Sequence, residues 1–185
     1  MISYPTAVAL VLALLPALGV RAAEPSLPPA PRTHAPGQCL PAGAAFFKAS
    51  LRGALSADLD WSAAQLQCDG GERPEGKGLR LSIAGPLAGA EGGAPRRLRF
   101  VFGIDTTAGH SGLPTNLTLL VEGEGQVFAT RGDVRCTTDS LQRDGHDTPG
   151  RVDVRGFCTG PATSLDGSQR VLLSRFDFSA RLSQE

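Results

Sequence analysis

The chain has 185 residues, a formal net charge of zero at pH 7, 41% hydrophobic residues and four cysteines. This length predicts one ordinary domain that is large enough to bury its own hydrophobic core. The balanced charge excludes a protein that is drawn to nucleic acid or to an anionic membrane surface by its overall electrostatic field, so no nucleic-acid partner is expected.

An uncharged apolar run covers Ala7–Val20 and ends at Arg21. Its fourteen residues are too few to span a bilayer core as a helix, which takes about twenty. Val20 and Ala22 fit the −3 and −1 positions of a cleavage site, so residues 1–22 are predicted to be a secretory signal peptide. The segment before the run lacks the usual Lys or Arg, and the alternative is a short buried helix of the mature fold.

A proline-rich segment, residues 23–38, follows the predicted signal peptide. It holds five prolines and almost no core-forming side chains, which is typical of a flexible linker. Cleavage would remove only Arg21 of the eighteen basic residues and none of the eighteen acidic ones, which leaves a net charge near −1. No second apolar stretch is long enough to span a membrane, so residues 39–185 are expected to form a single domain that does not cross one.

Alternating apolar and polar residues dominate the rest of the chain and predict β-strands. Between Phe47 and Trp61 the alternation predicts either a long bent strand or two strands joined near residues 53–56. Further strands are predicted over residues 79–83, 97–104, 117–121, 127–128, 133–141, 151–158 and 175–182. Turns are predicted at residues 69–71, 91–93, 123–125, 144–145, 149–150 and 166–167. About eight strands of this kind describe an all-β fold, an antiparallel β-sandwich with a small β-barrel as the alternative.

Four cysteines in an exported chain predict two disulfides. No two of them lie within four residues of each other, which excludes a CxxC redox pair and a zinc knuckle. Of the three possible pairings, a hairpin centred near Asp147 favours Cys136–Cys158, because residues that face each other across it have numbers that sum to about 294. Cys39–Cys68 is then the second disulfide.

The loop that begins at Asp105 is the one segment that combines an acid, a base and hydroxyl groups. Asp105, His110 and Ser111 are therefore the catalytic candidates, with Asp58 and Asp60 as further carboxylates. A catalytic triad needs groups that converge from separate elements, and the string GHSG lacks the frame of a nucleophile elbow. The sequence favours a non-catalytic protein, and the alternative is a hydrolase or carbohydrate-active enzyme on a β scaffold.

A second cluster, Asp139, Asp144, His146 and Asp147, has residue types that bind metal ions. Its spacing is not that of an EF-hand, and a hairpin turn accounts for the Asp-Gly and Pro-Gly pairs in this stretch. No metal site and no cofactor are expected.

Arginine outnumbers lysine sixteen to two and gathers on the polar faces of the predicted strands. Arg97, Arg99, Arg175 and Arg181 are the candidate binding residues, because neighbouring guanidinium groups would suit carboxylates, phosphates or sulfated sugars. Interleaved acidic residues favour an ion-paired, solvated face instead. The excess of arginine over lysine also indicates a GC-rich gene and a bacterial source.

The sequence thus favours an exported, non-catalytic binding or protein-interaction module of the cell envelope, periplasmic or secreted. The expected partner is an envelope protein, a glycan or a lipid headgroup. A carrier of a small apolar ligand is a further alternative, and it would need Phe46, Phe47, Phe100 and Phe102 to line a cavity.

Overall fold

The computed structural model of the protein describes residues 39–40, 44–73, 76–88, 96–131, 135–144 and 150–182. All of them belong to one unit of the chain, Thr33–Glu185. The predicted signal peptide, the predicted linker and the turns predicted at residues 91–93 and around Asp147 lie outside the described residues.

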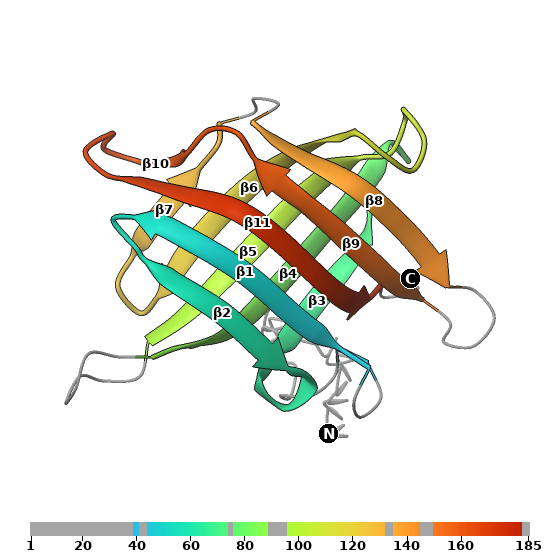
Figure 1. The fold of residues 1–185 in the computed structure, drawn as a ribbon, viewed down its shortest axis with the longest axis horizontal. Helices are drawn as coiled ribbons and strands as arrows, with labels where there is room; N and C mark the ends of the chain where they lie inside the picture. Colours follow the sequence, from blue (N-terminus) through green and yellow to red (C-terminus); the bar gives the residue numbers. More distant parts are fainter. Residues whose placement is uncertain are drawn as a thin grey trace, which may run out of the picture. The chain divides into compact units, whose positions relative to one another are not determined.

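Antiparallel β-strands make up the described fold, which confirms the all-β prediction (Figure 1). The strands are β1 (Phe46–Gly53), β2 (Ala57–Ser62), β3 (Gln67–Glu72), β4 (Gly78–Leu87), β5 (Arg96–Asp105), β6 (Leu113–Glu122), β7 (Gln126–Ala129), β8 (Cys136–Asp144), β9 (Arg151–Cys158), β10 (Ala162–Ser164) and β11 (Arg170–Arg181). A single 3-10 turn, η1 (Ala63–Gln65), connects β2 to β3. Within the described part of the chain, no helix is long and apolar enough to cross a membrane.

The strands form two layers that cross each other in Figure 1. One layer, here the β11 layer, has the hydrogen-bonded order β2-β1-β11-β9-β8, and the other, the β5 layer, has the order β7-β6-β5-β4-β3. The short strand β10 pairs with both β11 and β7, and β8 pairs with β6. Hydrogen bonding therefore passes from one layer to the other at two places, and the faces that the layers turn toward each other enclose a common core.

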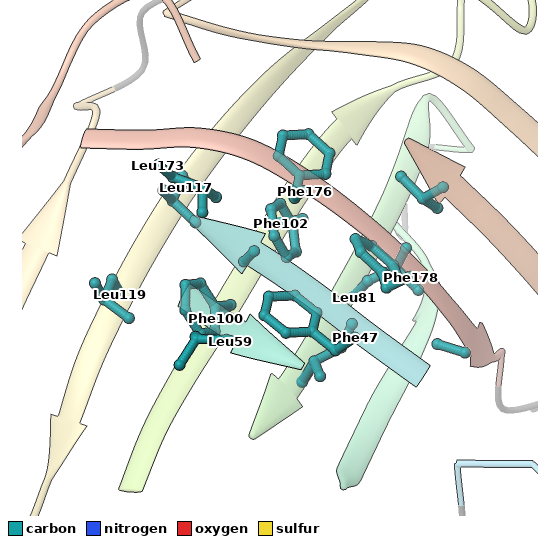
Figure 2. Packing of buried hydrophobic residues seen from close by; sticks show 14 of the residues in the cluster. Phe47, Leu59, Leu81, Phe100, Phe102, Leu117, Leu119, Leu173, Phe176 and Phe178 are labelled. Carbon is teal, nitrogen blue, oxygen red and sulfur yellow. The ribbon is translucent and has the colours of Figure 1, made fainter. Parts of the chain in front are cut away.

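The core follows from the alternation of apolar residues along each strand. In β5, for example, four apolar side chains are fully buried and their neighbours are half-exposed. Figure 2 shows how aromatic rings from both layers meet, and the ring centroid of Phe102 lies 4.9 Å from that of Phe176 and 5.0 Å from that of Phe178. Phe47 joins the same cluster, with its centroid 4.7 Å from that of Phe100. These rings hold the two layers together.

The structure decides between two alternatives that the sequence left open, and it differs from the sequence predictions at two other places. The alternation from Phe47 to Trp61 is divided into β1 and β2, because Gly53 has a φ of +114° and a Cβ there would lie 2.4 Å from the carbonyl oxygen of Arg170. The turn predicted at residues 69–71 is wrong, since these residues lie inside β3, where a Cβ on Gly70 would be 2.7 Å from the Leu81 side chain. The alternation also does not predict β10, which has only three residues.

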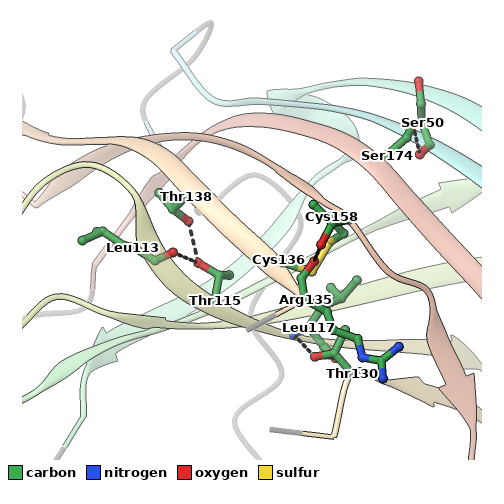
Figure 3. Close-up of a disulfide and its surroundings, with 11 residues drawn as sticks. Ser50, Leu113, Thr115, Leu117, Thr130, Arg135, Cys136, Thr138, Cys158 and Ser174 are labelled. Atoms are coloured by element: carbon green, nitrogen blue, oxygen red, sulfur yellow. Dashed lines mark hydrogen bonds between the residues drawn. A yellow bond between two sulfur atoms is a disulfide. The ribbon is translucent and has the colours of Figure 1, made fainter. Parts of the chain in front are cut away.

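Both disulfides form in the predicted pairing, Cys39–Cys68 and Cys136–Cys158. Cys136 lies directly opposite Cys158 in the register of β8 and β9, and Figure 3 shows this bond. The predicted register holds up to Thr138, after which an irregularity shifts it by one residue. The shift turns Leu141 into the core, where it is only 3% exposed.

The turn between β10 and β11 is organised around the carboxylate of Asp166. It accepts hydrogen bonds from Ser164 Oγ at 2.5 Å and from the hydroxyl and backbone N–H of Ser168 at 2.7 and 3.1 Å. The hydrogen bonds from Ser164 and Ser168 lower the pKa of Asp166 from 3.8 to about 2. Because the folded pKa lies below the unfolded one, the stabilisation is present above about pH 4 and is lost as the pH falls toward 2.

We predict that an NMR titration of the Asp166 carboxyl group has its midpoint near pH 2. Asp166→Asn removes this titration, so the unfolding temperature of the variant should fall less steeply between pH 4 and pH 2 than that of the wild type. Asp139→Asn, at an exposed position on β8, is the control and should keep the wild-type slope. A midpoint at the ordinary carboxyl value would contradict this account of the turn.

Candidate functional site

The arginines that the sequence singles out do not form one patch. Arg97 and Arg99 lie on β5, whereas Arg175 and Arg181 lie on β11 in the other layer. Arg97 Nε and Arg99 Nε both donate to the carboxylate of Glu122, at 3.2 and 2.6 Å. The charge of this arginine pair is thus shared with a carboxylate in the same sheet.

Ion pairs also cover the outer face of the β11 layer, as the interleaved acidic residues indicate. The pairs on this face are Lys48–Asp60 at 3.3 Å, Arg52–Asp58 at 2.9 Å, Arg151–Asp153 at 3.0 Å and Arg155–Asp177 at 3.2 Å. Exposed pairs of this kind contribute little to stability. Arg175 and Arg181 are exposed on β11, and their side chains make no hydrogen bond or ion pair within the described residues, so the charge of this layer is not fully paired.

The catalytic candidates of the loop after β5 are not joined into a triad. The Asp105 carboxylate accepts hydrogen bonds from the hydroxyl and the backbone N–H of Thr107, at 2.7 and 2.9 Å, and these bonds hold its pKa below the usual value. His110 and Ser111 are exposed, and in the described part of the chain no hydrogen bond links their side chains to Asp105. Asp105 therefore stabilises a turn rather than orienting a base.

The remaining carboxylates do not assemble a site either. Asp58 is bound by Ser50 and Arg52, and Asp60 by Lys48. Among the described residues, no three His, Cys, Asp or Glu side chains gather as they would around a metal ion. Asp139 is exposed on β8, and the other three candidate metal ligands have side chains outside the described part.

The phenylalanines proposed to line a carrier cavity lie in two different places. Phe47, Phe100 and Phe102 are completely buried, and their ring centroids are 4.7 to 6.5 Å apart. At these separations the rings pack against one another and fill the space between the layers. Phe46 is half-buried on the outer face of β1.

A hollow of about 450 Å³ lies on the outer face of the β5 layer. Its lining residues are Glu72, Arg73, Arg80, Val101, Gly103, Asn116 and Thr118. Four strands contribute to it, because β3, β4, β5 and β6 are consecutive neighbours in the sheet. Its volume falls within the range of small-molecule sites, about 300–1,000 Å³.

Strand register explains why the sheet is hollow at this point. Gly71, Arg80, Gly103 and Asn116 are paired in succession across β3, β4, β5 and β6, so Arg80 stands between two glycines. A Cβ on Gly71 would meet no atom within 4 Å, and one on Gly103 would meet only the Cβ of Asn116, at 3.8 Å. A side chain at Gly103, which lines the hollow, would project into it, and Gly71 leaves the other side of Arg80 open.

Arg80 differs from its neighbours in the β5 layer because its guanidinium group is uncommitted. It is exposed, and within the described residues it makes no side-chain hydrogen bond or ion pair, in contrast to Arg97 and Arg99. The side chains of Asn116 and Thr118, on the opposite wall, likewise have no hydrogen-bond partner among the described residues. One cation, one amide and one hydroxyl are thus available to a ligand in the hollow.

The surrounding charges favour a negatively charged ligand. The Glu72 carboxylate is bound by Arg143 Nη1 at 2.7 Å. Arg73 and Lys77 are close enough to Asp105 for their positive charges to help lower its pKa. Asp105 does not line the hollow. The hollow therefore presents more positive than negative charge to a ligand.

The sequence contains the signals for this site, but not in a form that alternation can reveal. Arg80 is one polar residue among others in the segment 79–83, and Gly71 has the character of a turn residue. Only the pairing of β3 with β4 and of β4 with β5 places the two glycines beside Arg80.

No family model, no curated protein and no solved structure matches the chain. The two disulfides fit a protein of an oxidising compartment outside the cytoplasm.

Proposed function

We propose that the chain is an exported, non-catalytic binding module of the bacterial cell envelope, periplasmic or secreted, which holds the anionic group of its ligand in the hollow of the β5 layer. The observation that carries this proposal is the uncommitted guanidinium of Arg80 between the side-chain-free positions Gly71 and Gly103. Arginine presents a planar fork of donors that matches carboxylate and phosphate oxygens.

The absence of paired acid–base chemistry in the hollow supports binding rather than catalysis. Its side chains offer no Ser, Cys or His nucleophile or base, and the Glu72 carboxylate is bound by Arg143. A nucleophile and a base within hydrogen-bond reach of each other are the usual requirement for covalent hydrolysis.

The proposal predicts that Arg80→Gln weakens retention of the protein by an anionic polymer. We would measure retardation during affinity electrophoresis in gels that contain polygalacturonate, a carboxylate polymer, or heparin, a sulfated one. Loss of a charge-assisted hydrogen-bonding group costs about 1.5–3 kcal/mol, so the apparent affinity should fall about tenfold or more.

Arg170→Gln is the matched control for this experiment. Arg170 is exposed on β11, in the other layer, and its substitution removes the same single charge. The control should be retarded like the wild type. Equal retardation of the two variants, or no retardation of the wild type by either polymer, would overturn the proposal.

A further inference from the structure

The net positive charge of the residues that line the hollow suits a ligand group with a single negative charge. Of its three charged lining residues, Glu72 is negative and Arg73 and Arg80 are positive, so together they carry a net charge of +1. Arg80 is the one that stands between Gly71 and Gly103 at the middle of the hollow. A carboxylate carries one negative charge and two oxygens in the plane of the guanidinium fork. A phosphate monoester carries about 1.5 to 2 negative charges at neutral pH and would need further cations.

The floor of the hollow is unsuited to phosphate for a second reason. Strong phosphate sites use several free backbone N–H groups, at a helix N-terminus or in a glycine-rich nest. Here the floor consists of paired strands, and the residues from Gly71 to Asn116 across the sheet are all in register with a neighbouring strand. Their backbone groups belong to the sheet ladders, so a ligand must be recognised by side chains.

The other side chains suit the hydroxyl groups and the C–H face of a sugar ring. The amide of Asn116 both donates and accepts hydrogen bonds, as does the hydroxyl of Thr118. Val101, which is paired with Thr118 in the sheet, adds a half-buried apolar surface. A carboxylate, hydroxyl groups and an apolar ring face occur together in a uronic acid.

Building on the proposed function, we infer that the ligand is a glycan that contains uronic acid residues, with one carboxylate bound by Arg80 and the ring hydroxyls bound by Asn116 and Thr118. The volume of about 450 Å³ accommodates roughly one or two sugar rings, so the rest of the glycan would extend over the exposed outer face of the β5 layer.

Isothermal titration calorimetry of the protein with a galacturonic acid trisaccharide tests this inference. The neutral galactose trisaccharide should bind at least about tenfold more weakly than the acidic one, because it lacks the charged partner of Arg80. Arg80→Gln should lose affinity for the acidic trisaccharide about tenfold, and Asn116→Ala about three- to tenfold. Arg170→Gln should bind like the wild type, and circular dichroism checks that each variant is folded.

Each result of this titration has a distinct meaning. Tighter, Arg80-dependent binding of galactose 6-phosphate or of an acidic peptide would overturn the uronic acid assignment while leaving an anion site at Arg80 in place. Equal affinity for the neutral and acidic trisaccharides would overturn the role of the carboxylate. If none of these anions binds in an Arg80-dependent way, both the uronic acid assignment and the proposed function are wrong.

Discussion

Phe102→Ala is expected to lower the free energy of unfolding by about 3–5 kcal/mol. The side chain is completely buried, and its ring lies between those of Phe176 and Phe178 in one layer and Phe100 in its own. Truncation removes apolar area from the core and leaves a cavity that paired strands cannot close. Equilibrium unfolding in urea or guanidinium chloride, followed by the fluorescence of Trp61, measures the change.

Phe157→Ala is the matched control for the core variant. Phe157 lies on β9 with 38% of its surface exposed, so its truncation should change the free energy of unfolding by less than about 1 kcal/mol. If Phe102→Ala cost no more than this control, the aromatic cluster would not be what holds the two layers together.

The double variant Cys136→Ala/Cys158→Ala is expected to lose about 3 kcal/mol of stability. The disulfide closes a loop with a sequence separation of 22 and joins β8 to β9, and β8 also pairs with β6 in the other layer. For a domain of this size, the loss corresponds to an unfolding temperature lower by about 6 to 12 °C. Differential scanning calorimetry at one scan rate measures the shift.

A reducing agent provides the control for the disulfide prediction. Reduction should destabilise the wild type by the combined effect of both bonds, and the double variant only by the effect of Cys39–Cys68. An unchanged unfolding temperature in the double variant would show that the strand pairing alone fixes this hairpin.

The sequence predicts those parts of the fold in which one strand carries its own signal. Alternation marks β5 and the predicted strand over residues 175–182 clearly, because every second side chain is buried over most of their length. The first half of β11, which begins at Arg170, is not predicted, and the alternation is broken where Ser174 and Arg175 are both exposed. The Cys136–Cys158 bond is predicted from a hairpin centred near Asp147, and its register agrees with that of β8 and β9 at the cysteines, although it is off by one residue nearer the turn. In β3, by contrast, close packing of Gly70 against Leu81 depends on a neighbouring strand, and glycine in isolation favours a turn.

The candidate site could not be predicted for the same reason. Arg97 and Arg99 stand out in the sequence, but Glu122 on the next strand binds both. Arg80 gains its importance from Gly71 and Gly103, which lie beside it only after three strands are paired. A site made of one residue from each of several strands leaves no local motif, so its chemistry becomes visible only in the folded sheet.

We propose that an anionic ligand binds in the hollow of the β5 layer. The most direct test is a map of amide chemical-shift changes in ¹H–¹⁵N NMR spectra of the protein as a galacturonic acid trisaccharide is added. We expect the largest changes at Arg80, at residues 101–103 and at residues 116–118, which surround the hollow. Changes centred instead on Arg175 in β11, or on the loop that holds His110, would contradict the assignment of the site.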